Sequence, residues 1–455
     1  MAKKLNSVLG VDIGSQKIKI AEVKLQGREP TITALGIADT PEGAVDHTGV
    51  YNSDAVGDVL KMLVGQSGVS VNQVVVSIAG QASVLVRTLE VPKMNPTELK
   101  EHMNWEITRN IPFAESTVVS DFKAFEPETP DAQNLDVVMA ISPQSAVDTM
   151  VAAVKRAGKS TAAIDVEPLS IARSLTASYA QDLSGLTVCA VDIGNKTTSI
   201  NIFKDGKLLM PRTVPLGGEM LTRALADNLG LSVDEAEALK RTSAAIPESA
   251  SGSVIGGFGA STQQFAAYNP FADDPASMNP NLMPMGMDAP AGDAPYNPFA
   301  SDEPAAPYNA GAGAEPAPYM PGADAEPVQP EPAMVPVPEP ELPAAPNAGA
   351  DDPETIRIYN AMASVIEEFV AEIRRSIDYF RSKGGDVNRI ELLGGGAKLK
   401  GLDAFLAKAL GIPTEMYDPL RNLQVNAKKL DPSVVDENRQ DLTVAIGNAL
   451  HIAFD

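Results

Sequence analysis

The chain has almost no cysteine and no long apolar run. Its 455 residues include one cysteine, Cys189, which lies inside an apolar segment. A disulfide framework is therefore excluded, and a reduced, buried thiol is expected. No stretch of 18 apolar residues occurs, and no apolar segment follows Lys3 and Lys4 as it would in a signal peptide. These absences predict a soluble, cytoplasmic protein.

Lysine and arginine are also scarce. The chain has 36 of them against 59 aspartates and glutamates, which gives a formal net charge of −23. Nucleic acids and anionic membranes are bound through Lys and Arg, so neither is expected as the main partner. No Lys or Arg lies between Arg241 and Arg357. Much of the negative charge therefore belongs to one segment.

This segment without basic residues holds 22 of the 36 prolines and has no hydrophobic periodicity. It cannot bury enough apolar area to offset its ordering entropy. We therefore predict that residues 244–353 form a long, disordered, acidic insertion rich in Pro and Ala. A Tyr-Asn-Pro-Phe-Ala motif occurs twice in it, at 268–274 and 296–302. The motif is either neutral repetition or a short binding site for a partner.

Outside the insertion, short apolar runs alternate with amphipathic segments, which indicates an α/β protein of two or more domains. Asn95 and Pro96 are typical of a helix start. We expect strands at 8–13, 18–25, 31–37, 74–78, 82–89, 118–125, 136–141, 186–193, 198–204 and 389–393, and helices at 53–65, 96–108, 144–157, 168–180, 218–230, 233–241, 401–410 and 441–451, with a long helix from 354 to the Gly384-Gly385 pair.

Glycine turns follow three of the expected strands. Val-Asp-Ile-Gly occurs at 11–14 and again at 191–194, and three glycines stand at 394–396. Glycine after a strand lets backbone N–H groups approach and bind phosphate. Asp12 and Asp192, at the strand ends, suit Mg²⁺ held through water, since this cation prefers oxygen ligands. The pattern predicts a nucleotide site.

These motifs, in this order, resemble those of the actin-like ATPase superfamily, which includes sugar kinases and Hsp70. The match is closer to the PilM family of type IV pilus assembly. The resemblance covers nearly all of the chain except 244–353. It is carried by a first phosphate loop at Val11–Lys19, a late helix at Arg375–Phe380, an adenosine motif at Ile390–Ala397 and the closing Ala445–Leu450 segment.

The resemblance implies an α/β actin-like fold of two lobes. The first lobe is expected at 1–185 and contains an inserted subdomain of the 1C type at about 80–163. The second lobe is expected at 186–243 together with 354–455.

The resemblance also implies a role for each residue of the cleft. Asn195 and Lys196 replace glycines that are usual in the second phosphate loop, which predicts slow ATP hydrolysis at most. Asp12 and Asp192 are expected to hold Mg²⁺ through water, and Glu167 is expected to position the attacking water. The residues expected to bind phosphate are Gly14, Ser15, Lys17, Gly194, Asn195 and Thr197. Contacts to ribose and base are expected from Gly218, Glu237 and Lys240, and packing beneath the adenosine from Gly394, Gly395, Gly396 and Lys398.

Simpler interpretations exist for several of these residues. Lys17 is equally typical of a solvated strand residue. Glu167 suits a helix N-terminus, Glu237 and Lys240 suit an ordinary helix ion pair, and the three glycines suit a plain turn from strand to helix.

As to function, the resemblance implies a scaffold that binds ATP and Mg²⁺ and links a cytoplasmic motor to a periplasmic alignment complex. Its implied partners are the N-terminal tail of a PilN-like inner-membrane protein and other pilus assembly components, with no nucleic acid and only indirect membrane contact. Alternatives are a cell-division actin like FtsA, a type II secretion scaffold and, less well supported, a small-molecule kinase of the same superfamily.

Overall fold

A computed structural model describes most of the chain outside the expected insertion. The interior of that insertion and both Tyr-Asn-Pro-Phe-Ala motifs lie outside the described residues. The described residues are 5–27, 29–114, 117–125, 132–179, 181–252, 352–427, 429 and 432–454.

The first lobe is built on a six-stranded mixed sheet. The first three strands pair antiparallel, and three later strands extend the sheet by parallel pairing. Helix α1 (Ser53–Ser67) and helix α3 (Gln144–Arg156) bury one face through an aliphatic core. The strand order is β14 (Gln424–Val425), β3 (Glu29–Asp39), β2 (Lys17–Gln26), β1 (Ser7–Ile13), β4 (Gln73–Ile78) and β8 (Ser160–Val166).

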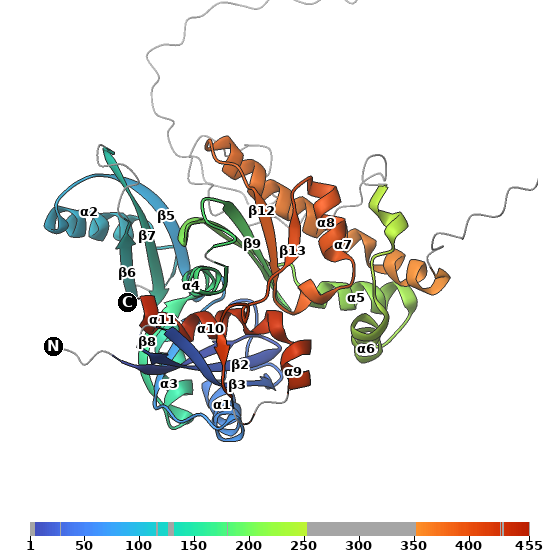
Figure 1. Ribbon diagram of the computed structural model, residues 1–455, viewed down its shortest axis with the longest axis horizontal. Coiled ribbons are helices and arrows are strands. Elements are labelled where there is room, and N and C mark those ends of the chain that lie inside the picture. The colour runs from blue at the N-terminus through green and yellow to red at the C-terminus, as the bar shows by residue number, and fades with distance from the viewer. Residues whose placement is uncertain are drawn as a thin grey trace, which may run out of the picture. The chain divides into compact units, whose positions relative to one another are not determined.

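The second lobe repeats this strand pattern. Its sheet also begins with an antiparallel hairpin pair and continues with parallel strands. The strand order is β11 (Lys207–Val214), β10 (Thr198–Lys204), β9 (Thr187–Ile193), β12 (Arg389–Leu393) and β13 (Thr414–Met416). The helices around the main core of this lobe are α5 (Gly218–Leu229), α6 (Val233–Ser243), α7 (Pro353–Ser382) and α8 (Leu402–Leu410). The predicted two-lobed α/β fold is confirmed (Figure 1).

A third sheet of three strands forms the inserted subdomain. Helix α2 (Pro96–Arg109) covers one of its faces with Leu99, Met103 and Ile107. Asn95 and Glu98 make a reciprocal capping box at the start of this helix, as the sequence indicates. The strands are β5 (Leu85–Pro92), β7 (Asn134–Pro143) and β6 (Val118–Ala124), with β7 central.

Several element predictions are wrong in detail. β5 begins at Leu85 instead of 82, because a turn closed by Ser83 and Val84 N–H groups on Gly80 O precedes it. β8 and β11 are absent from the expected strands, although Asp205-Gly206 before β11 is a typical hairpin turn. The expected closing helix is divided into η4 (Arg439–Leu442), α10 (Thr443–Ala449) and α11 (His451–Phe454). The other short helices are η1 (Glu248–Gly252), η3 (Gly395–Lys398) and α9 (Pro432–Glu437).

The expected boundary of the insertion also changes. Residues 244–252 belong to the described second lobe, where Ala244 and Ile246 are buried in its core. Ala245 forms a β-bridge with Lys400, and Ile246 N donates to Lys400 O. The segment is held because it supplies apolar side chains to α8 and its surroundings. At the other end, helix α7 begins at Pro353.

No helix among the described residues is long and apolar enough to cross a membrane.

Helix α10 packs so closely against its neighbours that glycine is required at the contact. A Cβ on Gly447 would lie 1.9 Å from the carbonyl oxygen of Ser170 in helix α4 (Glu167–Tyr179). A Cβ on Gly10 in β1 would lie 2.0 Å from Ala445 O. Real Cβ atoms do not approach other atoms this closely, so α4, α10 and β1 depend on these two glycines.

Asn448 connects the same three elements by hydrogen bonds. Its amide nitrogen donates to Val11 O at 2.7 Å and to Ser77 Oγ at 3.1 Å. Its amide oxygen accepts from Ser170 Oγ at 2.5 Å. The residue is fully buried, so losing any of these bonds leaves a polar group without water.

Glu391 is an unusual buried charge in β12. Its side chain is fully buried, and Arg389 Nε lies 2.6 Å from one carboxylate oxygen. That contact is not aligned as a hydrogen bond, and among the described residues neither carboxylate oxygen has a hydrogen-bond partner. Burial raises the pKa of Glu391 to about 7, although Arg389 opposes the shift.

We predict that Gly447→Ala destabilises the protein by about 3 kcal/mol or more, because the new methyl group overlaps Ser170. The matched control is Gly65→Ala in α1, where a Cβ meets nothing within 4 Å. That variant is expected to gain roughly 0.5–1 kcal/mol from helix propensity. Denaturant unfolding of both variants measures the difference, and a Gly447→Ala protein as stable as wild type would contradict the tight contact.

We also predict that Glu391 makes stability fall as pH rises. Its raised pKa means that the native state keeps a proton which the unfolded state releases between about pH 4.5 and pH 7. The loss amounts to up to about 3 kcal/mol at 1.36 kcal/mol per pKa unit. Glu391→Gln should remove this loss, so wild type and variant should differ more at pH 7 than at pH 5. Parallel stability curves over this range would show that Glu391 does not titrate in it.

Candidate functional site

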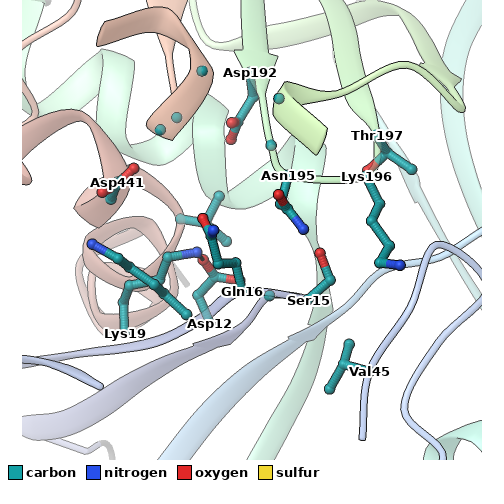
Figure 2. Close-up of a pocket in the computed structure, with 18 of the residues that line it drawn as sticks. Asp12, Ser15, Gln16, Lys19, Val45, Asp192, Asn195, Lys196, Thr197 and Asp441 are labelled. Carbon is teal, nitrogen blue, oxygen red and sulfur yellow. Dashed lines mark hydrogen bonds and ion pairs between the residues drawn. The ribbon is translucent and has the colours of Figure 1, made fainter. Parts of the chain in front are cut away.

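The two Asp-x-Gly turns have the same backbone geometry in the two lobes. Between β1 and β2, Gly14 N donates to Lys17 O at 3.0 Å. Between β9 and β10, Gly194 N donates to Thr197 O at 2.9 Å. Figure 2 shows Ser15 and Asn195, one from each turn, on facing sides of the same cavity. The duplicated sequence motif is therefore a duplicated structure.

Both turns line a cavity of about 530 Å³. The cavity brings together all sixteen residues that the sequence predicts for the site, although they come from distant segments. They are Asp12, Gly14, Ser15, Lys17, Glu167, Asp192, Gly194, Asn195, Thr197, Gly218, Glu237, Lys240, Gly394, Gly395, Gly396 and Lys398.

Three carboxyl groups gather at the strand ends in this cavity. Burial raises the pKa of Asp192 well above its usual range, and the neighbouring Glu167 and Asp12 charges raise it further. Burial also raises the pKa of Glu167, against a hydrogen bond from Ser199. Such a set of crowded carboxyl groups favours a bound cation, because a positive charge relieves their mutual repulsion.

Lys19 is the cation that the structure places beside these carboxyl groups. Its ammonium lies 2.8 Å from Asp12 Oδ2. Burial lowers the pKa of Lys19, but the carboxylates of Asp12 and Asp441 raise it above its ordinary value. The sequence interpretation missed this residue. Strand alternation offered a signal, since Lys17 and Lys19 lie two apart in β2 and share one face.

Lys17 lines the cavity, but its partner is unexpected. Its ammonium donates to Asn438 Oδ1 at 2.8 Å, and burial lowers its pKa. Lys398 reaches the same residue from the other lobe. It pairs with Asp441 Oδ2 at 2.9 Å and lies 3.3 Å from Asn438 Oδ1. Asn438 and Asp441 are thus cavity residues that local sequence patterns did not reveal.

The second aspartate turn is fixed to the start of α5. Gly218 N donates to Gly194 O and Glu219 N donates to Asn195 O, both at 2.9 Å. A Cβ on Gly217 would lie 2.4 Å from Asn195 O. Glycine at position 217 is therefore what lets the helix approach the loop.

Glu237 and Lys240 form the helix ion pair, and this half-buried pair belongs to a larger polar network. Lys240 Nζ lies 2.6 Å from Glu237 Oε2 and donates to Gly218 O at 2.9 Å. Burial raises the pKa of Glu237, but hydrogen bonds from Lys240, Thr222 and Arg241 lower it to about 2. Gln16 of the first lobe also contacts Glu237, at 3.4 Å. Glu237 is therefore held ionised where the first lobe contacts the second.

The third glycine turn closes against the second aspartate. Gly394 has a φ of 78°, and a Cβ there would lie 2.2 Å from Asp192 Oδ1. A Cβ on Gly396 would lie 2.3 Å from Ile193 Cγ2. Glycine at 394 and 396 is thus needed for the turn after β12 to pack against the end of β9.

A loop of the first lobe joins the cavity to the inserted subdomain. Residues 45–50 of this loop include cavity-lining side chains. Thr48 O accepts a hydrogen bond from Ser83 Oγ at 2.7 Å, and a Cβ on Gly80 would lie 2.4 Å from Thr48 O. Ser142, at the end of β7, donates to Ser83 O at 2.7 Å. The loop is therefore connected through Ser83 to the end of β7 in the subdomain sheet.

No group of three or more His, Cys, Asp or Glu side chains in the described part of the chain is arranged to hold a metal ion directly. Asp12 and Asp192 offer carboxylate oxygens, the ligand type that Mg²⁺ prefers. The glycine turns leave open backbone beside this acidic pair. The donor set fits a Mg²⁺–phosphate group better than an isolated metal ion.

Two family profiles match the chain. The profile described as type IV pilus assembly protein PilM matches residues 10–266, which is more than half of the chain. The profile described as cell division protein FtsA matches residues 189–434. Both families therefore share sequence patterns with the lobe that contains the second aspartate turn.

Curated relatives and solved structures agree with these profiles. The chain is 25% identical over 279 residues to cell division protein FtsA of Rhizobium meliloti, covering 55% of this chain and 62% of that protein. It is 36% identical over 88 residues to FtsA of Bacillus subtilis, covering 19% of each chain. The chain thus spans less than two thirds of these relatives. A structure titled PilM-PilN type IV pilus biogenesis complex matches with a TM-score of 0.68 and 23% identity, covering 99% of both chains, and shows that this protein has the same actin-like fold.

Proposed function

The chain belongs to the PilM family of type IV pilus assembly proteins, and we propose that it is a cytoplasmic, ATP-binding scaffold of that machinery. One observation carries the nucleotide part of this proposal. Two matching glycine turns, each preceded by an aspartate, line the same cavity from two lobes of equal strand order. This is the geometry that a bound nucleoside triphosphate needs on both sides of its phosphates.

Each part of the cavity then has a proposed role. Backbone N–H groups at Ser15 and Asn195 bind the phosphates, and the ammonium of Lys19 adds charge. Asp12 and Asp192 hold Mg²⁺ through water, and the bound ion supplies neutralisation of phosphate charge. The adenosine lies toward the other predicted residues, which are Gly218, Glu237, Lys240, Gly394, Gly395, Gly396 and Lys398.

Hydrolysis is expected to be slow. Glu167 is the proposed residue that orients a water, but burial raises its pKa and so lowers the share of Glu167 that is ionised and can accept a proton. Asn195 and Lys196 occupy the second loop where glycines are usual in the superfamily. Their side chains take space beside the phosphates. We therefore propose that the nucleotide acts mainly as a structural ligand.

The proposed partner is an extended N-terminal tail of a PilN-like inner-membrane protein. A related structure with this fold is titled as a PilM-PilN complex. The inserted subdomain offers a suitable strand, because β6 is at the edge of its sheet and Val119, Ser120 and Asp121 are exposed. Through this tail and other pilus components the protein would be held at the inner membrane and would link motor to alignment complex.

The loop at residues 45–50 explains how nucleotide and partner are coupled in this proposal. It contacts the nucleotide cavity on one side and the Gly80–Ser83 turn on the other. The turn leads into β5 and bonds to the end of β7. A nucleotide that fixes the loop therefore also selects one arrangement of the inserted subdomain.

A second candidate is a cell-division actin similar to FtsA, favoured by the FtsA profile over residues 189–434. A type II secretion scaffold and a small-molecule kinase are less well supported. Binding of a synthetic PilN-like tail favours the pilus scaffold. Phosphorylation of a small acceptor, without tail binding, favours the kinase instead.

We predict that Asp12→Asn weakens Mg-ATP binding at least about tenfold, because one charge-assisted contact to the hydrated cation is lost. Asparagine keeps the shape of the side chain beside Lys19, so the fold should persist. Calorimetric titration with ATP, with Mg²⁺ and with EDTA, measures the effect. Removing Mg²⁺ should weaken ATP binding by wild type, but it should weaken ATP binding by the variant only slightly.

Asp227→Ala is the matched control, since Asp227 is exposed on α5 and does not line the cavity. Its ATP affinity should equal that of wild type. Unchanged ATP binding by a folded Asp12→Asn protein would refute the assignment of the cavity.

A further inference from the structure

Lys196 differs from three other lysines of the cavity in the position of its carboxylate partner. Lys19, Lys240 and Lys398 pair with Asp12, Glu237 and Asp441, which all line the cavity. Lys196 pairs instead with Glu219, at 3.2 Å, and Glu219 does not line it. Among these four ion pairs, the one made by Lys196 therefore has its carboxylate outside the cavity lining.

The Glu219 carboxylate holds two cations, and only one of them faces the cavity. Arg223, one turn further along α5, donates to Glu219 Oε1 from Nε at 3.1 Å. Arg223 is exposed and does not line the cavity. Burial raises the pKa of Glu219, but hydrogen bonds from Arg223 and Lys196 lower it overall. If Lys196 moves to a ligand, Arg223 still compensates the carboxylate.

Lys196 is also placed at the end of the cavity opposite the third glycine turn. Figure 2 shows Asp441 on one side of the cavity and Lys196 on the other, with the Lys196 side chain running toward the side where Ser15 and Val45 lie. Asp441 pairs with Lys398 of the third turn, the proposed adenosine end. A triphosphate extending away from that end brings its last phosphate toward Lys196.

We propose that Lys196 binds the terminal phosphate of a nucleoside triphosphate and so makes this protein prefer the triphosphate over the diphosphate. This inference rests on the proposed function, because it assumes a nucleotide in the cavity. The Lys196 ammonium then leaves the Glu219 carboxylate and binds an oxygen of the terminal phosphate. This phosphate carries more negative charge than the carboxylate and lies inside the cavity. The backbone of its loop need not move, since α5 fixes Asn195 and Gly194.

The test compares ATP and ADP affinities of the full chain, with Mg²⁺, for wild type, Lys196→Ala and Arg223→Ala. Lys196→Ala should lose ATP affinity by about tenfold, the expected loss for one charge-assisted hydrogen bond, with ADP affinity nearly unchanged. Arg223→Ala, which removes the other partner of the same carboxylate, should keep the wild-type ratio of affinities. Lys196→Arg should retain most of the preference for ATP.

Three results would overturn the inference. They are an unchanged ratio in Lys196→Ala, an equal loss of ATP and ADP affinity, and a similar change in Arg223→Ala, which would assign the effect to the ion pair with α5. Thermal unfolding of each variant establishes that it is folded, and Lys196→Gln provides a second neutral variant. If wild type binds neither nucleotide, the proposed function fails as well. If wild type binds ATP and Asp12→Asn weakens it, a failure with Lys196→Ala concerns this inference alone.

Discussion

The close approach of α10 to α4 and β1 is the constraint on which the rest of the structure depends. Gly447 and Gly10 remove the side chains that would keep these elements apart, and Asn448 joins all three by hydrogen bonds. β1 ends in the first aspartate turn, and α4 begins with Glu167. The contact therefore fixes the position of the first turn relative to the proposed water-orienting carboxylate. The second lobe adds its own turn at the end of an equivalent strand.

This geometry brings three acidic side chains together in a cavity that lysine side chains also line. Burial raises the pKa values of Glu167 and Asp192, the charge of Asp12 raises both further, and Lys19 compensates only part of the negative charge. Contacts between the lobes, such as Gln16 with Glu237, close the cavity around these side chains. The same cavity is joined to the inserted subdomain through Thr48, Ser83 and Ser142. In the proposed function, charge in the cavity and exposure of a partner site are thereby linked.

Local patterns predicted the parts of the fold and site that depend on local chemistry. The Asp-x-Gly turns, the Asn95 cap and the apolar face of α7 all follow from neighbouring residues. Asn438 was missed because it meets Lys17 across 421 positions of the chain, a contact that only the folded state creates. β8 was missed because its alanines have weak strand propensity and its order comes from pairing with β4. Residues 244–252 were assigned to the insertion because composition does not reveal that Ile246 reaches the core.

The central claim is that nucleotide in the cavity and partner on the inserted subdomain influence one another. The most direct measurement is the affinity of the full chain for a synthetic PilN-like tail peptide, by calorimetry, with and without saturating Mg-ATP. The proposal predicts tighter peptide binding with Mg-ATP, and an equal factor by which the peptide tightens ATP binding, as linkage requires. Peptide binding of the same affinity in both conditions would contradict it.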